Sequence, residues 1–169
     1  MMSKSHNEKL IHRLFEVEAA KDPHGVALVF KGQALSYQAL NARANHLANH
    51  LISLGVTRGE IVALSMERSP QMLISMLAIL KCGAAYLPLD NSNPVPHNIY
   101  CLKTANVSVM MLDHSFPELD ELSIACVNTK DDALFNSECD QDLDIISTGD
   151  SKAYVMFTSG STGRSKGVV

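Results

Sequence analysis

The chain has 169 residues, of which 46% are hydrophobic and 19% are charged, with a mean hydropathy of +0.04. This composition can build the core of one domain and excludes an intrinsically disordered protein. A net charge of −4 argues against nucleic acid as a main partner, because nucleic-acid-binding domains usually carry a basic face. No stretch reaches the roughly 18 apolar residues of a membrane span.

The first nine residues lack the apolar core of a signal peptide. We therefore expect a flexible N-terminus at 1–9, a cytoplasmic protein and no membrane partner. The four cysteines are irregularly spaced and form no Cys-x-x-Cys pair, so neither a disulfide framework nor a zinc site is expected. Cys82 and Cys101 fall on apolar segments and are expected to pack as small core residues.

Helix and strand signals alternate along the chain. Apolar residues at helical spacing predict helices at 10–20, 36–54, 72–80 and 97–105. Short apolar runs between turn residues predict strands at 26–30, 34–35, 60–66, 84–89, 107–112, 123–127 and 153–157. This alternation predicts an α/β fold in which helices cover a mostly parallel sheet.

Caps and apolar faces give these helices their expected ends and orientations. Ser36 and Ser69 are N-cap residues, while Gly55 and Gly83 supply left-handed stops. The helix at 72–80 is apolar almost all round and should be buried. The apolar side of the first helix is expected to consist of Leu10, Leu14, Phe15 and Val17.

A loop rich in Gly, Ser and Thr follows the last expected strand. Glycines let such a loop turn tightly, and successive N–H groups in the turn bind anions. Hydroxyl groups add donors, and a lysine adds a point charge suited to phosphate. The candidate phosphate-binding residues are Thr158, Ser159, Gly160, Ser161, Thr162, Gly163 and Lys166.

The spacing differs from the Walker A pattern. Only Arg164 and Ser165 separate Gly163 from Lys166, and a glycine follows that lysine where Walker A has Ser or Thr. The alternative interpretation is a flexible Gly/Ser linker or tail. The strand signal before the loop and the Gly-Val-Val after it favour a loop between two strands.

Three stretches together resemble the adenylate-forming superfamily, most closely the adenylation domains of nonribosomal peptide synthetases. They lie at 35–45, 80–90 and 154–167, in the order of the first three core motifs of that family. The resemblance implies a partial AMP-binding domain at 10–169, the N-terminal portion of the large subdomain, cut just after the phosphate-binding loop. Cys82 and Ser165 depart from the motifs, where Ala and Pro are usual.

The resemblance also implies a reaction. ATP and a carboxylate, usually an amino acid, form an acyl-adenylate, and the acyl group then passes to the phosphopantetheine arm of a carrier domain. The candidate residues from Thr158 to Gly163 would cradle the departing β- and γ-phosphates, with Lys166 nearby and Mg²⁺ bridging phosphate oxygens. Such an enzyme must hold the carboxylate in line with the α-phosphate and stabilise the charge that develops.

The family's remaining motifs, including its catalytic lysine, are absent from this sequence. We therefore expect no catalytic residue within the chain, and no adenylate formation by the chain alone. Two alternatives stay open. The chain could be a non-catalytic remnant or split-gene half that only binds a partner chain, or part of a stand-alone acyl-CoA or carrier-protein ligase.

Two other groups of residues have simpler interpretations. His46 and His50 lie four apart on a helix, but zinc sites need more ligands, so a solvated face is expected. Six acidic residues between 131 and 144 lack the spacing of a calcium loop, so we expect a solvated surface connection over 131–150.

Overall fold

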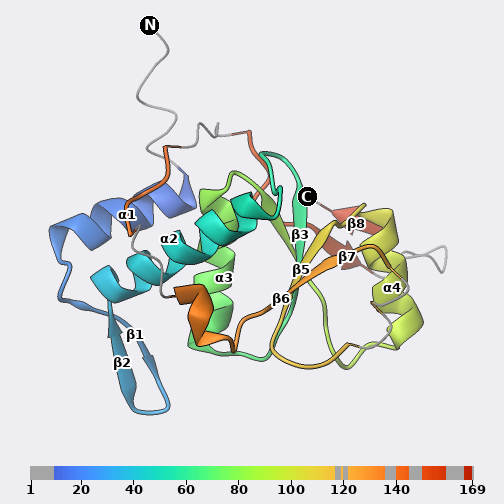
Figure 1. The fold of residues 1–169 in the computed structure, drawn as a ribbon, viewed down its shortest axis with the longest axis horizontal. Coiled ribbons are helices and arrows are strands. Elements are labelled where there is room, and N and C mark those ends of the chain that lie inside the picture. Colours follow the sequence, from blue (N-terminus) through green and yellow to red (C-terminus); the bar gives the residue numbers. More distant parts are fainter. Residues whose placement is uncertain are drawn as a thin grey trace, which may run out of the picture.

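The computed structural model describes residues 10–116, 119, 122–135, 140–144, 150–158 and 166–168 (Figure 1). The helices are α1 (Ile11–Lys21), α2 (Tyr37–Ser53), α3 (Pro70–Lys81), α4 (Val95–Thr104) and the short 3-10 helix η3 (Asp132–Phe135). The strands are β1 (Val26–Phe30), β2 (Gln33–Ser36), β3 (Ile61–Ser65), β4 (Ala85–Pro88), β5 (Val109–Leu112), β6 (Ala125–Asn128), β7 (Met156–Thr158) and β8 (Lys166–Val168).

A parallel sheet of order β4-β3-β5-β6 forms the centre of the molecule. A later segment adds to its β4 edge, where the Tyr86 N–H donates to the Ala153 carbonyl at 3.1 Å and the Val155 N–H donates to the Tyr86 carbonyl at 2.9 Å. Two antiparallel hairpins, β1-β2 and β7-β8, lie outside the sheet. The predicted α/β fold with a mostly parallel sheet is confirmed.

Helices cover both faces of this sheet, so the molecule has three layers (Figure 1). Alternate residues of the central strand face opposite layers, because side chains alternate along a strand. Val62 and Leu64 pack in the same buried cluster as α2 and α3, whereas Ala63 packs with Cys101 and Leu102 of α4. The strands are therefore apolar on both faces, as expected of a covered parallel sheet.

The predicted helix caps are confirmed. The Ser36 hydroxyl accepts a hydrogen bond from the Ala39 N–H, and the Ser69 hydroxyl accepts one from the Met72 N–H, each at 3.2 Å. Past the ends of α2 and α3, Gly55 and Gly83 have φ angles of +91° and +72°, a region that side chains other than glycine rarely adopt.

The predicted apolar side of α1 is wrong. Leu14 and Val17 are about half exposed, at 53% and 49%, whereas His12 and Glu16 are buried. Glu16 turns inward because the ammonium group of the fully buried Lys81 lies beneath it and needs an anionic partner. Phe15 does pack against the core, where its ring contacts Tyr37 with centroids 5.8 Å apart.

Some element boundaries also differ from the predictions. Helix α4 begins at Val95 rather than at residue 97, with a proline in its first turn, where a missing N–H costs least. Strand β7 begins at Met156 rather than at residue 153, because residues 153–155 pair only with Tyr86. Within the described part of the chain, no helix is long and apolar enough to cross a membrane. The N-terminus at 1–9 lies outside the described residues.

Candidate functional site

The Gly/Ser/Thr loop joins two paired strands. Strands β7 and β8 are antiparallel, and their ladder pairs Met156 with Val168 and Thr158 with Lys166. Opposed residues in such a ladder have Cα atoms about 5 Å apart. The outermost candidate phosphate-binding residues, Thr158 and Lys166, are thereby brought together, and the strands predicted on either side of the loop are confirmed.

The structure describes only part of the candidate site. The Thr158 side chain is exposed, and for Lys166 only the backbone at the start of β8 is described. The other candidates lie outside the described residues, namely Ser159, Gly160, Ser161, Thr162 and Gly163. The assignment of these seven residues to phosphate binding stays a prediction.

The strand that leads into the loop is held by its neighbours on both sides. Tyr86 of β4 binds residues 153 and 155 through its backbone, and its ring lies 6.0 Å from that of Tyr154. Farther along the same segment, the ring of Phe157 in β7 meets the ring of Tyr100 of α4 edge-on, with centroids 6.3 Å apart. The stretch at 80–90 therefore supports the stretch at 154–167, a relation that their separate positions in the sequence do not show.

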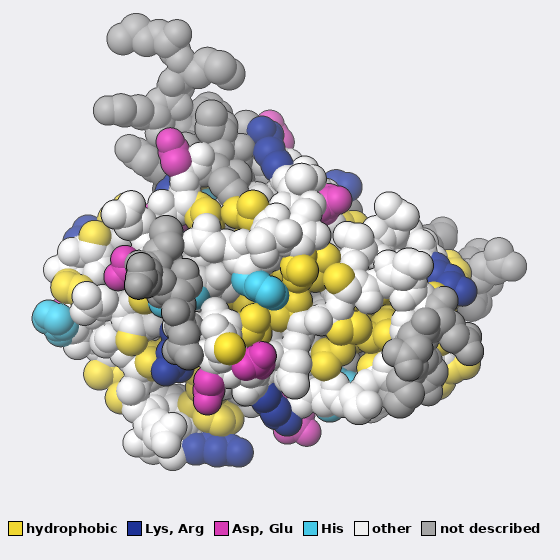
Figure 2. All heavy atoms as spheres, viewed as in Figure 1, with side chains coloured by type: hydrophobic (Ala, Val, Ile, Leu, Met, Phe, Trp, Pro, Cys, Tyr) yellow, Lys and Arg dark blue, Asp and Glu magenta, His cyan; other side chains and the backbone are white. Residues whose placement is uncertain are grey.

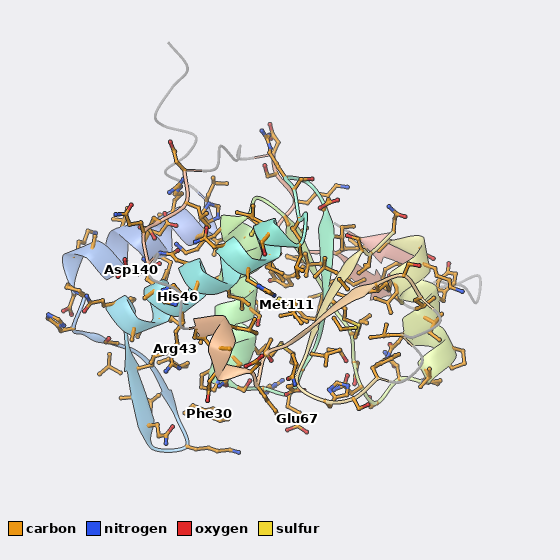
Figure 3. All side chains as sticks on the ribbon, in the orientation of Figure 1. Phe30, Arg43, His46, Glu67, Met111 and Asp140 are labelled. Carbon is orange, nitrogen blue, oxygen red and sulfur yellow. The ribbon has the colours of Figure 1, made fainter. Side chains whose placement is uncertain are left out.

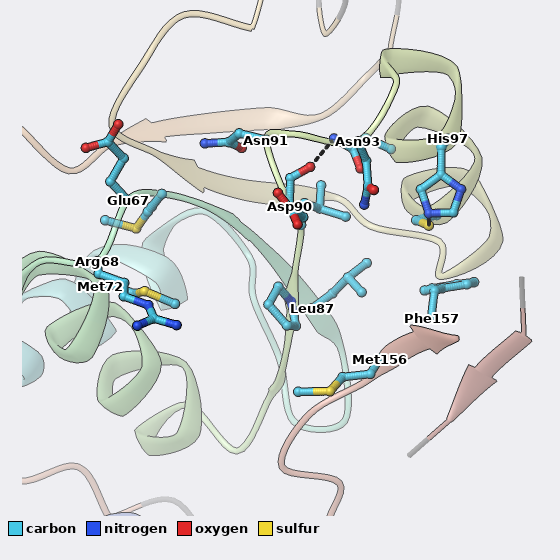
Figure 4. Close-up of a pocket in the computed structure, with 15 residues that line it drawn as sticks. Glu67, Arg68, Met72, Leu87, Asp90, Asn91, Asn93, His97, Met156 and Phe157 are labelled. Carbon is cyan, nitrogen blue, oxygen red and sulfur yellow. Dashed lines mark hydrogen bonds between the residues drawn. The ribbon is translucent and has the colours of Figure 1, made fainter. Parts of the chain in front are cut away.

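A groove of about 830 Å³ lies beside β7, at the carboxyl ends of β3 and β4 (Figure 4). This is the edge at which α/β proteins usually bind ligands. Figure 4 shows Glu67, Arg68 and Met72 on one side and His97 and Phe157 on the other. The full lining is Met66, Glu67, Arg68, Met72, Leu87, Pro88, Leu89, Asp90, Asn91, Asn93, His97, Asn98, Cys101, Met156 and Phe157.

The β4–α4 connection gives this groove a preorganised polar wall. Asp90 accepts hydrogen bonds from the Ser92 hydroxyl at 2.7 Å and from the Ser92 N–H at 2.8 Å, and these bonds hold the pKa of Asp90 below its usual value. The buried Asn98 amide donates to the Asp90 carbonyl at 3.0 Å. Among the described residues, no group of three or more His, Cys, Asp or Glu could hold a metal ion.

Ser65, His114 and Asp113 form a chain of polar contacts below the groove. His114 Nδ1 lies 2.9 Å from Asp113 Oδ1, and His114 Nε2 lies 3.4 Å from Ser65 Oγ. Burial opposes ionisation of Asp113, but hydrogen bonds from His114 and from the Glu67 N–H hold its pKa below the usual value.

These contacts do not make a hydrolase triad. Ser65 is completely buried and its hydroxyl donates to Asn91 Oδ1, so it cannot reach a substrate. The 3.4 Å separation from His114 is also longer than an ordinary hydrogen bond from a hydroxyl group. The chain of contacts instead joins the connections that follow β3, β4 and β5.

A second polar cluster lies on the opposite side of the sheet, around Lys81. This side chain is fully buried and pairs with Glu16 and, at 2.9 Å, with Asp142. Asn41 and Asn45 donate to the same Asp142 oxygen at 2.8 and 3.0 Å. Burial opposes ionisation of Asp142, but hydrogen bonds from Lys81, Asn45 and Asn41 hold its pKa below the usual value.

The expected surface connection agrees with Asp142, whose side chain is 39% exposed, but its pairing with the buried Lys81 was not predicted. The sequence did contain a signal for this pairing. Lys81 directly follows the apolar helix predicted at 72–80, and a buried ammonium group at that place requires a partner carboxylate.

The face of α2 that carries His46 is only partly covered: His46 and His50 are half-buried, whereas Arg43 and Ser53 are exposed (Figure 3). His46 Nδ1 lies 2.8 Å from the Phe135 carbonyl, and the Arg43 guanidinium lies 6.0 Å from the centre of the Phe135 ring. Helix η3 thus packs on this face. The expected solvated face is therefore confirmed at Arg43 and Ser53, whereas the contact of His46 with η3 was not predicted.

The prediction that Cys82 and Cys101 pack as core residues is confirmed. Cys82 and Cys101 are both buried. Burial raises the pKa of Cys82 to about 12 and also raises that of Cys101, so both stay protonated and act as small core residues. The Cys82 thiol donates to the Ala48 carbonyl at 3.3 Å, which joins α3 to α2.

Comparison with known proteins relates residues 15–169 to the family described as "AMP-binding enzyme". Gramicidin S synthase 2 of Brevibacillus brevis is 40% identical over 159 residues, which are 94% of this chain but only 4% of that protein. The N-terminal subdomain of NpsA from Klebsiella oxytoca, solved with 3-hydroxybenzoyl-AMSN, superposes with a TM-score of 0.81 at 28% identity. That match covers 95% of this chain and 40% of the NpsA chain.

A related structure, NpsA-ThdA, is an artificially fused adenylation–PCP di-domain of a nonribosomal peptide synthetase from the same organism. It matches with a TM-score of 0.81 and 28% identity, over 95% of this chain and 32% of its own. The chain thus spans a small part of its curated relatives and well under half of these structures.

Proposed function

The chain belongs to the AMP-binding enzyme family, and from that membership we propose that it supplies the ATP-phosphate-binding part of an enzyme of nonribosomal peptide synthesis. The enzyme would activate an amino acid or another carboxylic acid as its adenylate. One observation carries the proposal: the Gly/Ser/Thr loop joins the paired strands β7 and β8 next to the carboxyl edge of the parallel sheet.

Seven residues would bind the phosphates of ATP in this enzyme. We assign to this role Thr158, Ser159, Gly160, Ser161, Thr162, Gly163 and Lys166. Hydroxyl and backbone N–H donors would stabilise the negative charge that builds up on the leaving pyrophosphate, and the lysine would neutralise part of it. Mg²⁺ would arrive on the phosphate oxygens of ATP.

The remaining steps would need residues outside this chain. Alignment of the carboxylate with the α-phosphate requires a substrate pocket, and we assign no catalytic residue to the 169 residues present. Transfer of the acyl group would require the phosphopantetheine arm of a carrier domain. The adenylation–PCP fusion among the structural matches supports this partner. We also propose a cytoplasmic location, where ATP is available.

Phosphate binding can be tested on the chain itself. The thermal unfolding temperature of the 169-residue protein is measured during titration with Mg-ATP and with Mg-pyrophosphate. Saturable stabilisation is expected, because a ligand that binds only the folded state raises its stability. The stabilisation should disappear in Gly163→Asp combined with Lys166→Ala and persist in Lys130→Ala, which removes an exposed lysine beside β6. Equal stabilisation of all three proteins would contradict the proposal.

A further inference from the structure

We propose that Lys81 and Asp142 form an anchor that positions the strand leading into the Gly/Ser/Thr loop. The inference rests on the proposed phosphate-binding function of that loop, and its test separates the two. Lys81 and Asp142 touch no proposed ligand and act through the chain between them and β7, so they are positioning residues.

The anchor starts from a buried cation. Lys81 ends α3, is wholly shielded from solvent and lies between Glu16 and Asp142. A small cavity of about 140 Å³ adjoins both carboxylates, together with Asn41 and Asp140. The Lys81 ammonium already supplies the positive charge these oxygens need, so the cluster is complete without a metal ion. Its role is to hold Asp142 in place.

Asp142 belongs to a segment at 140–144 that all three helices of this layer hold. Asn45 of α2 donates to the Asp140 carbonyl at 2.7 Å, and Arg13 of α1 donates to the Leu143 carbonyl at 2.9 Å. Lys81 of α3 pairs with the Asp142 carboxylate between them, and Leu143 packs against the buried cluster. Among the described contacts of this segment, Asp142 makes the most, because it also receives hydrogen bonds from Asn41 and Asn45.

The same helix–strand unit that provides Lys81 also holds the segment farther along. Tyr86, at the start of β4, binds Ala153 and Val155 through its backbone, directly before β7. Residues 140–158 are therefore attached to α3 at Asp142 and to β4 at Ala153 and Val155. Residues 80–90 therefore hold both ends of the segment at 142–155 that leads into the loop.

The entropy lost on closing the chain between the anchor and residue 153 determines how strongly the anchor supports the pairing with β4. Ten residues separate Asp142 from Ala153, whereas seventeen separate Phe135 of η3 from Ala153. Release of the 140–144 segment would nearly double the loop that closes when residues 153–155 pair with β4. Because closure entropy grows with the logarithm of loop length, the pairing should weaken about two- to threefold.

The first test measures amide hydrogen exchange of the 169-residue protein and of Asp142→Ala. We expect exchange at Val155 and Tyr86 to rise about two- to threefold, while exchange at Ala63 in the central strand stays unchanged. Asp144→Ala is the matched control, because Asp144 is an exposed carboxylate of the same segment. Asp142→Asn keeps an acceptor oxygen for Lys81 and should fall between wild type and Asp142→Ala.

Faster exchange at 140–144 with no change at Val155 would overturn the inference, since the two attachments would then be independent. A second readout is the dissociation constant of Mg-pyrophosphate, expected to rise by the same two- to threefold in Asp142→Ala and to be restored in part by Asp142→Asn. An unchanged constant in a variant whose Val155 exchange had risen would overturn the link to the loop. No binding by the wild type, with the exchange response present, would refute the proposed function and leave the anchor intact.

Discussion

The two faces of the central sheet differ in the helices that cover them and in the size of the cluster buried beneath those helices. On one face, α1, α2 and α3 close over a large apolar cluster and a buried ionic cluster at Lys81 (Figure 3). On the other face, α4 covers a smaller cluster, and a groove of about 830 Å³ opens at the carboxyl edge of the strands, between the start of α3 on one side and α4 and β7 on the other (Figure 4). The face covered by α1, α2 and α3, here called the closed face, supplies stability and fixed attachment points, and the groove at the carboxyl edge supplies space for a ligand.

The surface shows the same division. Figure 2 shows hydrophobic side chains still visible over the region where the strands of the sheet run in Figure 1. Exposed apolar side chains also lie on β7 and β8, where Met156 is 47% and Val168 is 51% exposed. Substitutions on the closed face should therefore change stability far more than substitutions at these exposed positions.

Loss of the buried cation should have the largest effect. Lys81→Met removes one of the two cations that pair with the buried Glu16, while Arg13 stays 2.8 Å from it. The loss should therefore lie toward the lower end of the about 3–5 kcal/mol of unfolding free energy that breaking a buried ion pair costs. Urea denaturation should show this loss. The control Lys130→Met removes an exposed lysine and should change the stability by less than about 0.5 kcal/mol. Equal stabilities of the two variants would show that the closed face does not depend on its ionic cluster.

A core truncation on each face sharpens the comparison. Leu47 in the α2 layer and Leu102 in α4 are both completely buried, so Leu→Ala at either should cost about 2–5 kcal/mol. We expect the Leu102→Ala cost at the lower end, because the side of the sheet that borders the groove can relax more easily into the space left. Matched urea titrations would decide this, and a larger cost at Leu102 would reverse our ranking of the two faces.

The closed face should also respond to pH. Burial, followed by the charges of Arg13 and Lys81, lowers the pKa of His12 from 6.5 to about 4. Between these values the unfolded chain binds a proton that the folded chain does not, so stability should fall as the pH decreases from 6.5 to 4. Below that range the lowered pKa of Asp142 adds a further loss, as this carboxylate becomes protonated.

Thermal unfolding at pH 7, 6, 5 and 4 measures this dependence. His12→Gln should flatten the profile between pH 6.5 and 4, whereas His24→Gln, at an exposed position, should leave it unchanged. Identical profiles for wild type and His12→Gln would show that His12 is not the group responsible.

A lost helix cap should have a smaller effect. Ser36→Ala removes the side-chain acceptor for the Ala39 N–H and should cost about 1 kcal/mol. Ser36→Asp keeps an acceptor and should recover most of the stability. The smallest change is expected at Leu14, whose exposed side chain should tolerate Leu14→Gln within about 0.5 kcal/mol. A loss above 2 kcal/mol at Leu14 would instead favour the original prediction of an inward-facing side chain.

Local chemistry made much of the fold predictable. Serine caps, glycine stops and apolar runs act over a few neighbouring residues, so α2, α3 and the alternation of helices and strands along the chain followed from the sequence. The orientation of α1 did not, because Glu16 faces inward toward a lysine 65 residues away. Hydrophobic periodicity assigns charged residues to solvent and cannot foresee a buried ion pair.

The candidate site, like the fold, was predictable only where local sequence determines the structure. The apolar segments on either side of the loop predicted two strands, and β7 and β8 confirm them. The groove and its Asp90 wall, and the attachment at Tyr86, depend on contacts between separate elements. Such contacts leave no local pattern in the sequence.

The pairing of Tyr86 with residues 153 and 155 has a consequence for the order of folding. Strand β4 is complete by residue 88, but the segment that covers its outer edge follows about 65 residues later. During synthesis at about 5–20 residues per second, this edge stays open for several seconds after β3 and β4 can pair. Open strand edges promote intermolecular pairing, so the nascent chain is most vulnerable to aggregation in that interval. A ribosome-bound chain ending near residue 120 should therefore bind chaperones more strongly than the released protein.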